Sequence, residues 1–436
     1  SHHVHALLLR GLQELERLFP GFERTLTEHG ARRIELGNEL AHCTEWGWAP
    51  RAVIGVEPMT VSRVLLESVL REHLRAAPRN IELIEETRTT GLMSVREGDR
   101  VRVTGVTTSR PELRELKADL VIDAAGRSGK CLEWLQSRGV DRPEREVVDA
   151  FGGYASRFYE LAPNPRRWWR GMLVDPKAPS GRRWGLLMPV ENGRCVLTLA
   201  GMNREYPPHE EQAFEAYLNS LPTKALAREI ARAKPVSDIH SFRALYNRAH
   251  HFETWNRQVG GFVSLGDSAI AFNAYHGQGM SMAAVAARVL GDSLAASPAA
   301  DGFELSRSFH RAQWKALQPA WQIATEIDME WPGTEGKRPV GYALTLAAGI
   351  AVVRASHEFP QIKRWIGPAY QLVAPRYSLL RPELVGLVLL SELRRRLGRR
   401  LPLEPVESAW FAQEHLEPQG DTSAARATAG AEPAML

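Results

Sequence analysis

The sequence predicts an α/β fold built from more than one domain, and three observations support this prediction. Two short apolar runs, "ADLVIDAAG" (residues 118–126) and "FVSLGD" (residues 262–267), have the composition of buried strands and end at or next to glycine. The middle of the chain alternates strand patterns with turn residues, and the last third has helical patterns. At 436 residues, the chain also exceeds the length of one ordinary domain core.

Residues 1–150 are expected to hold two amphipathic helices, a small antiparallel meander and a buried strand. The apolar residues of each helix recur three or four positions apart. Pro20 and Gly21 end the first helix, and Ser62 can cap the second. The expected elements are helices over residues 8–19 and 62–74 and strands over residues 81–86, 100–108 and 118–126, with a turn at residues 97–100.

Residues 151–255 are expected to form a separate antiparallel sheet with one helix. The stretch "RWGLLMPVENGRCVLTLAG" (residues 183–201) predicts a hairpin, because Asn192 and Gly193 stand between two apolar strands. The other expected segments are an amphipathic helix at residues 209–221, a return to the first domain at residues 256–300, a helical region at residues 301–416 and a disordered tail at residues 417–436.

Charge and cysteine content exclude several classes of function. The net charge is +4 and the arginines are scattered, so the sequence shows no footprint for nucleic acid. Cys43, Cys131 and Cys195 form no CxxC pair and resemble small buried hydrophobes of a reducing compartment, which predicts a cytoplasmic protein. No metal site is predicted, and the sequence does not indicate an oligomeric state.

The longest apolar stretch is "VGYALTLAAGIAVV" (residues 340–353). It is shorter than the roughly 20 residues that a membrane-spanning helix needs, so stable membrane insertion is not expected. The stretch predicts a buried helix, and contact with a membrane surface is the alternative.

The stretch "GDSAIAFNAYHGQGMSMA" (residues 266–283) places an acid and then two glycines directly after a buried strand. Ligands collect where buried strands end in α/β folds, and the helix that follows Gly277 and Gly279 offers unpaired N–H groups. Asp267 would repel an anion but can accept hydrogen bonds from hydroxyls. FAD suits both the N–H groups and the Asp267 carboxylate, since it combines a phosphate and an electron-poor ring with a polyol. An ordinary strand–turn–helix explains the same spacing.

Four motifs, taken in order, resemble FAD-dependent monooxygenases of the hydroxybenzoate-hydroxylase fold. The closest pattern is that of bacterial flavin epoxidases that act on polyene precursors of polyethers. The resemblance covers residues 2–400. It implies an FAD-binding Rossmann-like domain, an antiparallel-sheet substrate domain and a helical C-terminal region. The matching stretches are "HVHALL" (3–8), "SRVLLESVLREHL" (62–74), "ADLVIDAAGRSG" (118–129) and the glycine turn, joined by "YASRFY" (154–159) and "GLLMPVENGRCVLTLAG" (185–201).

The resemblance also implies cofactor contacts. Asp267 would bind the ribityl chain or the adjoining phosphate, and the glycine turn would face the isoalloxazine ring and the pyrophosphate. Arg63 would reach the phosphates, Gly126 would let its strand pass close to FAD, and His5 would lie near the flavin. The alternatives are that Arg63 is only a solvated charge, that Gly126 is only a turn glycine and that His5 is only a packing residue. The implied cofactor-binding residues are Asp267, Gly266, Gly277, Gln278, Gly279, Met280, Arg63, Gly126 and His5.

The sequence departs from the family pattern at several places. Ile270 stands where the family usually has histidine, and Ala274 where it commonly has proline. The first strand, its GxGxxG turn and the acidic residue that holds the ribose have no counterpart. The chain is expected to begin about forty residues late, which is of the order of one βαβ unit. This departure leaves FAD binding by the chain itself open.

The resemblance implies that NAD(P)H reduces the flavin and that dioxygen then forms a flavin hydroperoxide, which transfers one oxygen atom. The substrate would be an apolar, polyene or aromatic small molecule of secondary metabolism, either epoxidised or hydroxylated. No catalytic side chain is required, because the cofactor carries the chemistry. The candidate pocket walls are Trp168, Trp169, Trp184, Met188, Phe272 and Tyr275; each could equally be a core or interface residue.

Two other functions remain open at this stage. The chain could be another flavin enzyme of the same fold, such as a double-bond reductase or a halogenase. It could also be a cofactor-free binding module, since the dinucleotide turn is missing.

Overall fold

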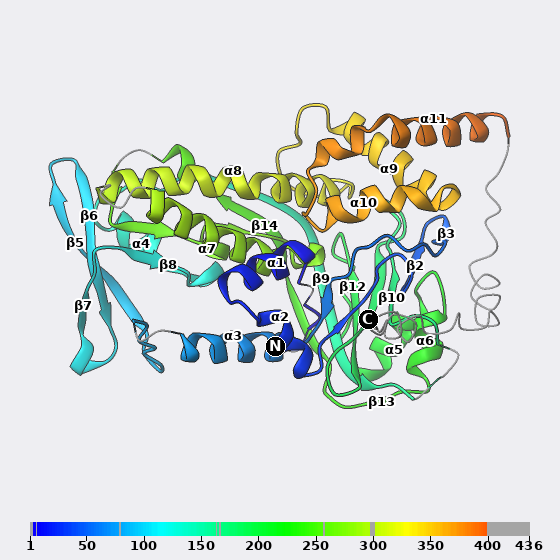
Figure 1. Ribbon diagram of the computed structural model, residues 1–436, viewed down its shortest axis with the longest axis horizontal. Helices are drawn as coiled ribbons and strands as arrows, with labels where there is room; N and C mark the ends of the chain where they lie inside the picture. Colours follow the sequence, from blue (N-terminus) through cyan, green and yellow to red (C-terminus); the bar gives the residue numbers. More distant parts are fainter. Residues whose placement is uncertain are drawn as a thin grey trace, which may run out of the picture.

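The computed structural model describes residues 3–398, except residues 6, 78–79, 163, 165–166, 256–257 and 297–300. The expected tail at residues 417–436 and the last part of the helical region, residues 399–416, lie outside the described residues. Figure 1 shows a large sheet, a helical layer above it and an α/β part beside it.

The large sheet has nine strands in the order β17-β14-β9-β12-β11-β10-β2-β3, with β13 paired to β9. The pairs are antiparallel except β10 and β2, which run parallel. The sheet therefore takes strands from before and after residues 151–255. Its strands are β2 (Leu40–Thr44), β3 (Gly47–Trp48), β9 (Arg145–Glu160), β10 (Gly171–Val174), β11 (Arg183–Pro189), β12 (Arg194–Gly201), β13 (Lys234–Pro235), β14 (His240–His250) and β17 (Ile270–Ala271).

The predicted hairpin and helix of this region are confirmed. β11 and β12 pair antiparallel from Arg183 to Gly201, and Asn192 and Gly193 both have positive φ, as their turn requires. One face of the sheet is covered by α5 (Glu211–Asn219) and α6 (Ala225–Ile230), which bury Phe214 and Leu226 against it.

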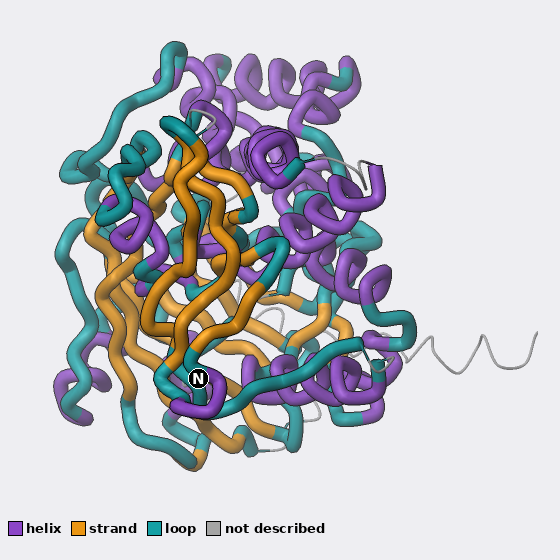
Figure 2. The backbone as a smooth tube through the Cα atoms, turned by 90° about the vertical axis from the view of Figure 1, so that its left-hand side faces the viewer, coloured by secondary structure: helices purple, strands orange, loops and turns teal. Residues whose placement is uncertain are grey.

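The α/β part contains two short parallel pairs and a meander. β8 pairs with β16, and β15 pairs with β6. Helices α7 and α8 pack beside these strands, and the β5–β7 meander projects from the end of the molecule (Figures 1 and 2). The elements are β5 (Thr89–Glu97), β6 (Arg100–Thr108), β7 (Glu115–Lys117), β8 (Val121–Asp123), α4 (Cys131–Gln136), β15 (Val259–Gly260), β16 (Phe262–Ser264), α7 (Gly279–Ala296) and α8 (Gly302–Asp328).

The first 76 residues add three helices beside α7. Both predicted helices are confirmed, and Ser62 caps the second by accepting a hydrogen bond from the Leu65 N–H at 3.1 Å. Close packing of α1 on α7 leaves no room for a side chain at Gly11, because a Cβ there would lie 2.4 Å from Ser281 Oγ. The elements are α1 (Leu9–Leu18), α2 (Phe22–Glu28), β1 (Arg32–Arg33), β4 (Met59–Thr60) and α3 (Arg63–Ala76).

The strand predicted at residues 81–86 is wrong. These residues lie outside every helix and strand, and Ile81 and Leu83 are exposed. Their alternating pattern has no neighbouring strand to pair with, whereas the next segment, β5, pairs with β6. The turn predicted at residues 97–100 joins β5 to β6, as expected.

The described part of the C-terminal region is helical, as predicted. After α8 come α9 (Tyr342–Glu358), α10 (Lys363–Tyr370) and α11 (Pro382–Arg396). The helix predicted around residues 340–353 forms, but its expected burial is wrong: Val340 and Leu344 are exposed, because the first half of α9 extends beyond the elements it packs on. No helix among the described residues is both long and apolar enough to cross a membrane.

His251 ties the start of β9 to the end of β14. Its Nε2 lies 3.0 Å from the Glu146 carboxylate and its Nδ1 lies 2.7 Å from the Glu253 carboxylate. These two hydrogen-bonded carboxylates raise the pKa of His251 from 6.5 to about 10. Since the folded-state pKa is raised, charged His251 stabilises the fold fully below about pH 6.5, and this contribution is lost as the pH rises through about 10.

We therefore expect His251→Gln to lower the free energy of unfolding by about 2 kcal/mol at pH 6 and by much less at pH 10. Chemical denaturation at both pH values measures this difference. His209→Gln is the matched control, because His209 is exposed and lies 3.3 Å from a single carboxylate; it should leave unfolding unchanged. An equal loss at both pH values for His251→Gln would contradict the ion-pair explanation.

Candidate functional site

Two strand ends meet at the centre of the candidate site. β8 and β16 run parallel, with Ser264 opposite Asp123, so the residues that follow each strand lie side by side. The Ser268 hydroxyl joins the two turns: it lies 3.2 Å from Asp123 Oδ1 and accepts a hydrogen bond from the Gly126 N–H at 2.8 Å. Asp267 therefore lies next to the strand end at Gly126.

Gly126 and Gly266 shape the backbone at these strand ends. Both have positive φ, of 74° and 61°, which side chains other than glycine rarely adopt. A Cβ on Gly126 would meet no atom within 4 Å, so the backbone there faces open space. This space is available to a ligand.

The glycine turn leads into the N-terminus of α7, which points its free N–H groups at the same place. Gly277 has positive φ, and a Cβ on Gly279 would lie 3.8 Å from Asp267 Oδ1. Gln278 is fully buried, yet neither its Nε2 nor its Oε1 has a hydrogen-bond partner among the described residues. Met280 is half-buried against the core formed by α1–α3. An unsatisfied buried amide indicates a missing partner.

Three arginines influence Asp267, and one of them lies close to its carboxylate. Arg127 Nε lies 3.7 Å from Asp267 Oδ2, and Arg248 donates to the Asp267 carbonyl at 2.6 Å. Burial raises the pKa of Asp267, and Arg127, Arg248 and Arg63 oppose this shift, although 41% of the side-chain surface remains exposed. The arginines add positive charge beside the helix N-terminus, where an anionic ligand would be favoured.

The N-terminal histidines lie against the same region. Burial and the nearby charge of Arg63 lower the pKa of His5 to about 4, so its ring is neutral at physiological pH. The His3 ring packs edge-on against Tyr154 of β9, with ring centroids 4.5 Å apart. Arg63 begins α3 and pairs with Glu67 at 2.6 Å. Arg63 is thus close enough to influence the ionisation of both His5 and Asp267.

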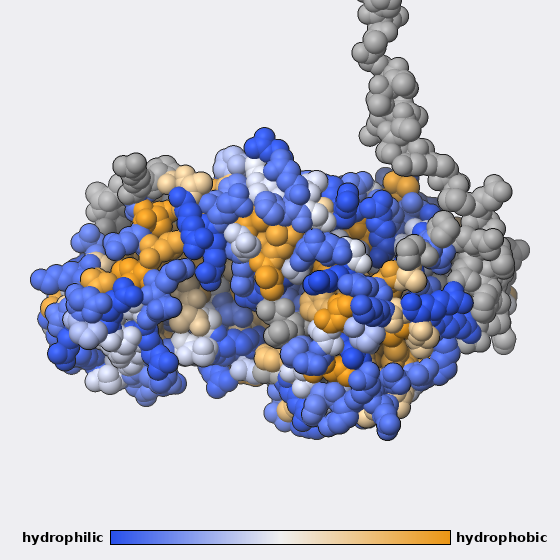
Figure 3. All heavy atoms as spheres, turned by 90° about the horizontal axis from the view of Figure 1, so that it is seen from below, coloured by the Kyte–Doolittle hydropathy of each residue, from blue (hydrophilic) through white to orange (hydrophobic). Residues whose placement is uncertain are grey.

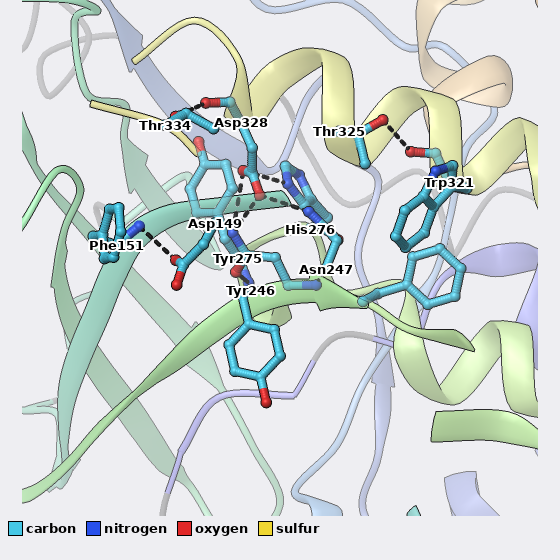
Figure 4. Close-up of polar contacts among 12 residues, drawn as sticks. Asp149, Phe151, Tyr246, Asn247, Tyr275, His276, Trp321, Thr325, Asp328 and Thr334 are labelled. Atoms are coloured by element: carbon cyan, nitrogen blue, oxygen red, sulfur yellow. Dashed lines mark hydrogen bonds and ion pairs between the residues drawn. The ribbon is translucent and has the colours of Figure 1, made fainter. Parts of the chain in front are cut away.

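A buried carboxylate holds the glycine turn in place (Figure 4). Asp328, the last residue of α8, is fully buried. Its oxygens accept hydrogen bonds from Asn247 Nδ2 at 2.7 Å, from Asn273 Nδ2 at 2.9 Å and from His276 Nε2 at 2.9 Å. Asp328 therefore joins α8 to β14 and to Asn273 and His276, which lie on either side of Tyr275 in the sequence.

Three of the predicted pocket residues share one face of the large sheet. Trp184 and Tyr275 pack edge to face with ring centroids 4.8 Å apart. Met188 follows Trp184 by four positions on β11, so both side chains project from the same face. Trp184 is buried, and its Nε1 has no hydrogen-bond partner among the described residues. This apolar face lies on the side of the sheet that carries the glycine turn.

The structure corrects the expectation for Trp168, Trp169 and Phe272. Trp168 and Trp169 belong to the core between the sheet and α5 and α6, on the opposite face. Phe272 is buried in the core beneath α8, where its ring lies 6.4 Å from that of Trp321. Their aromatic character gave no indication of the face they occupy.

Sequence reasoning missed the residues that support the turn. Arg127 directly follows the predicted Gly126 and could have been found as part of the same motif. Asp328 and Asn247 lie 81 residues apart in the chain and carry no local pattern that would link them.

Asp328→Asn should lower the free energy of unfolding by about 3 kcal/mol. The new amide N–H₂ would face N–H groups that now donate hydrogen bonds to the carboxylate, so these donors would lose an acceptor. Glu326→Gln is the matched control: it makes the same exchange on the same helix at a residue that remains partly exposed and pairs with Arg376. Urea denaturation of the two variants tests this. Similar stabilities for both would contradict the role assigned to Asp328.

Comparison with known proteins identifies the fold. No protein-family model matches the chain. Protein Rv3254 of Mycobacterium tuberculosis is 27% identical over 422 residues, covering 90% of this chain and 84% of that protein.

Two solved structures extend this comparison. The flavin-dependent brominase Bmp2 is 14% identical, with a TM-score of 0.58 over 89% of this chain and 84% of that one. PqsL, a probable FAD-dependent monooxygenase from Pseudomonas aeruginosa, is 16% identical, with a TM-score of 0.53 over 76% of this chain and 86% of that one. The chain therefore has the fold of FAD-dependent monooxygenases and halogenases of the hydroxybenzoate-hydroxylase type, as its motifs predicted.

Proposed function

We propose that the protein is an FAD-dependent monooxygenase that uses NAD(P)H and dioxygen to epoxidise or hydroxylate an apolar, polyene or aromatic small molecule. The observation that carries this proposal is that Gly126, Asp267 and the N-terminus of α7 lie together, and that the buried amide of Gln278, next to Gly279, has no hydrogen-bond partner among the described residues. The fold it shares with flavin enzymes is consistent with that chemistry but does not select the substrate.

The described residues fit the flavin and ribityl half of FAD. The Gln278 amide can both donate and accept, as the polar edge of an isoalloxazine ring requires. Asp267 can accept hydrogen bonds from ribityl hydroxyls, and Arg63 and Arg127 can offset phosphate charge. The glycine turn brings backbone N–H groups close to the ring and the pyrophosphate. The GxGxxG turn that would hold the rest of the pyrophosphate does not occur in the sequence.

When bound, FAD would supply the activation of dioxygen that side chains cannot provide. The chain's own residues would then have two tasks, to orient the substrate and to exclude water. Trp184, Met188 and Tyr275 suit both, because they form apolar surface close to the glycine turn. Trp184 Nε1 has no hydrogen-bond partner within the described part of the chain, and it could orient a polar group of an otherwise apolar substrate.

A flavin spectrum and oxygen uptake test the proposal directly. The purified protein is titrated with FAD and then supplied with NADH or NADPH, and candidate products are weighed by mass spectrometry. A product that gains one oxygen atom supports the proposal. Gain of a halogen would assign the protein to the halogenases, and a product reduced without oxygen uptake would assign it to the reductases. Absence of any flavin spectrum after FAD is added would favour a cofactor-free binding module.

Asp267→Ala should weaken FAD binding by about 10- to 100-fold, because it removes a charged hydrogen-bond acceptor from the ribityl site. Quenching of flavin fluorescence measures the dissociation constant. Asp292→Ala, near the far end of the same helix, is the control and should bind FAD as the unchanged protein does. Equal affinities for both variants would remove Asp267 from the site.

Trp184→Leu should weaken binding of an apolar substrate by about tenfold while leaving FAD affinity unchanged. A fluorescent conjugated polyene fatty acid serves as the probe. Trp168→Leu is the control, because Trp168 lies on the other side of the sheet over Arg51. If Trp168→Leu has the larger effect on the probe, the substrate binds on the opposite face.

A further inference from the structure

Helix α11 carries an apolar stripe that faces away from the protein. The stripe consists of Val385, Leu389, Leu393 and Leu397, which recur every four residues and are all exposed, with Leu389 at 64%. Leu384, Leu387 and Val388 lie on the other side of the helix and pack toward α9. α11 is therefore apolar on two sides, one buried against α9 and one exposed, whereas an ordinary surface helix has an apolar side only toward the core. It lies at the outer edge of the helical layer (Figure 1).

The start of α9, in the same helical layer, also exposes apolar residues. Val340 and Leu344 extend into solvent, and Ile350 is also exposed. α9 packs against α11, so both helices belong to one layer. Elsewhere, on the face that carries α3, apolar patches are interrupted by hydrophilic side chains (Figure 3). Exposed apolar residues that follow one side of a helix indicate an interaction surface.

The same layer is strongly basic. Residues 336–398 contain 10 Lys and Arg residues and three Asp and Glu residues, whereas the whole chain has a net charge of +4. The remainder of the chain is therefore net negative. Lys337 and Arg338 directly precede the apolar start of α9, and Arg381 precedes α11; within the described part of the chain, none of them forms an ion pair.

We propose that this layer binds the surface of an anionic lipid membrane, with α11 lying in the plane of the interface. The apolar stripe would enter the boundary between headgroups and acyl chains, and the flanking cations would contact the anionic headgroups. A second copy of the chain fits this surface less well, because it would bring two faces of excess positive charge together. The proposal does not depend on the flavin chemistry proposed above.

Sedimentation with lipid vesicles tests this proposal on the full chain. Vesicles of phosphatidylcholine containing phosphatidylglycerol should bind the protein, and vesicles of phosphatidylcholine alone should bind it at least about tenfold more weakly. The variant Leu389→Glu/Leu393→Glu should lose binding to the anionic vesicles by at least about tenfold. Val95→Glu is the control, because Val95 is an exposed apolar residue on the β5–β7 meander, and it should bind as the unchanged protein does.

Equal binding to both kinds of vesicle, or full binding by the double variant, would overturn the proposal. Circular dichroism of the double variant establishes that it folds. Size-exclusion chromatography with light scattering tests whether a second copy of the chain covers the stripe instead. If the protein is a dimer and Leu389→Glu converts it to a monomer, the surface belongs to a second copy and the proposal is overturned.

A fluorescent probe distinguishes a stripe that contacts the membrane from a stripe that another part of the protein covers. Cys43, Cys131 and Cys195 are all buried, so an environment-sensitive thiol dye on Leu389→Cys reports that position. Its emission should resemble that of a water-exposed dye alone and shift to the blue with anionic vesicles, whereas the dye on Val95→Cys should not shift. Blue-shifted emission of Leu389→Cys before vesicles are added would show that protein covers the stripe and would contradict the proposal.

Discussion

The candidate site depends on the parallel pairing of β8 with β16. The pairing brings the turn at Gly126 against the turn at Ser268, which lies 142 residues further along the chain. Each strand has only three residues, so the side chains at their ends must help to hold the register. Ser268 does so by joining Asp123 to the Gly126 backbone. Asp267 can face the start of α7 only while this register is kept.

The second constraint is the end of α8. Asp328 accepts three side-chain hydrogen bonds in a fully buried position, and two of the donors belong to the segment between β17 and α7. A buried carboxylate is costly unless donors surround it, so this arrangement favours one conformation of the segment over others. The large sheet, α8 and the glycine turn are therefore joined through one carboxylate.

The sequence predicted the elements whose determinants are local. The hairpin at residues 183–201 depends on its own turn residues, Asn192 and Gly193, which both have positive φ. The helix that begins at Arg63 depends on Ser62, the residue directly before it, which caps it. Elements that depend on distant partners were not predictable. The pattern at residues 81–86 has no partner strand, whereas β2 gains one in β10 more than a hundred residues away. Trp169 was a candidate pocket wall or core residue, and the structure places it in the core beneath α5 and α6; aromatic character does not encode which face of a sheet a residue occupies.

The helical layer connects the basic apolar surface to the candidate site. On its inner side, His357 of α9 lies 2.9 Å from the Thr44 hydroxyl at the end of β2. Burial lowers the pKa of His357 to about 4, so the ring is neutral, and its Nδ1 donates to the Val353 carbonyl. Its Nε2 must therefore accept the proton of Thr44. At the other end of the layer, Gln371 follows α10 and accepts a hydrogen bond from the Leu9 N–H at the start of α1 at 2.8 Å. The layer that carries the exposed stripe is therefore held both to the large sheet and to α1, the helix that packs on α7.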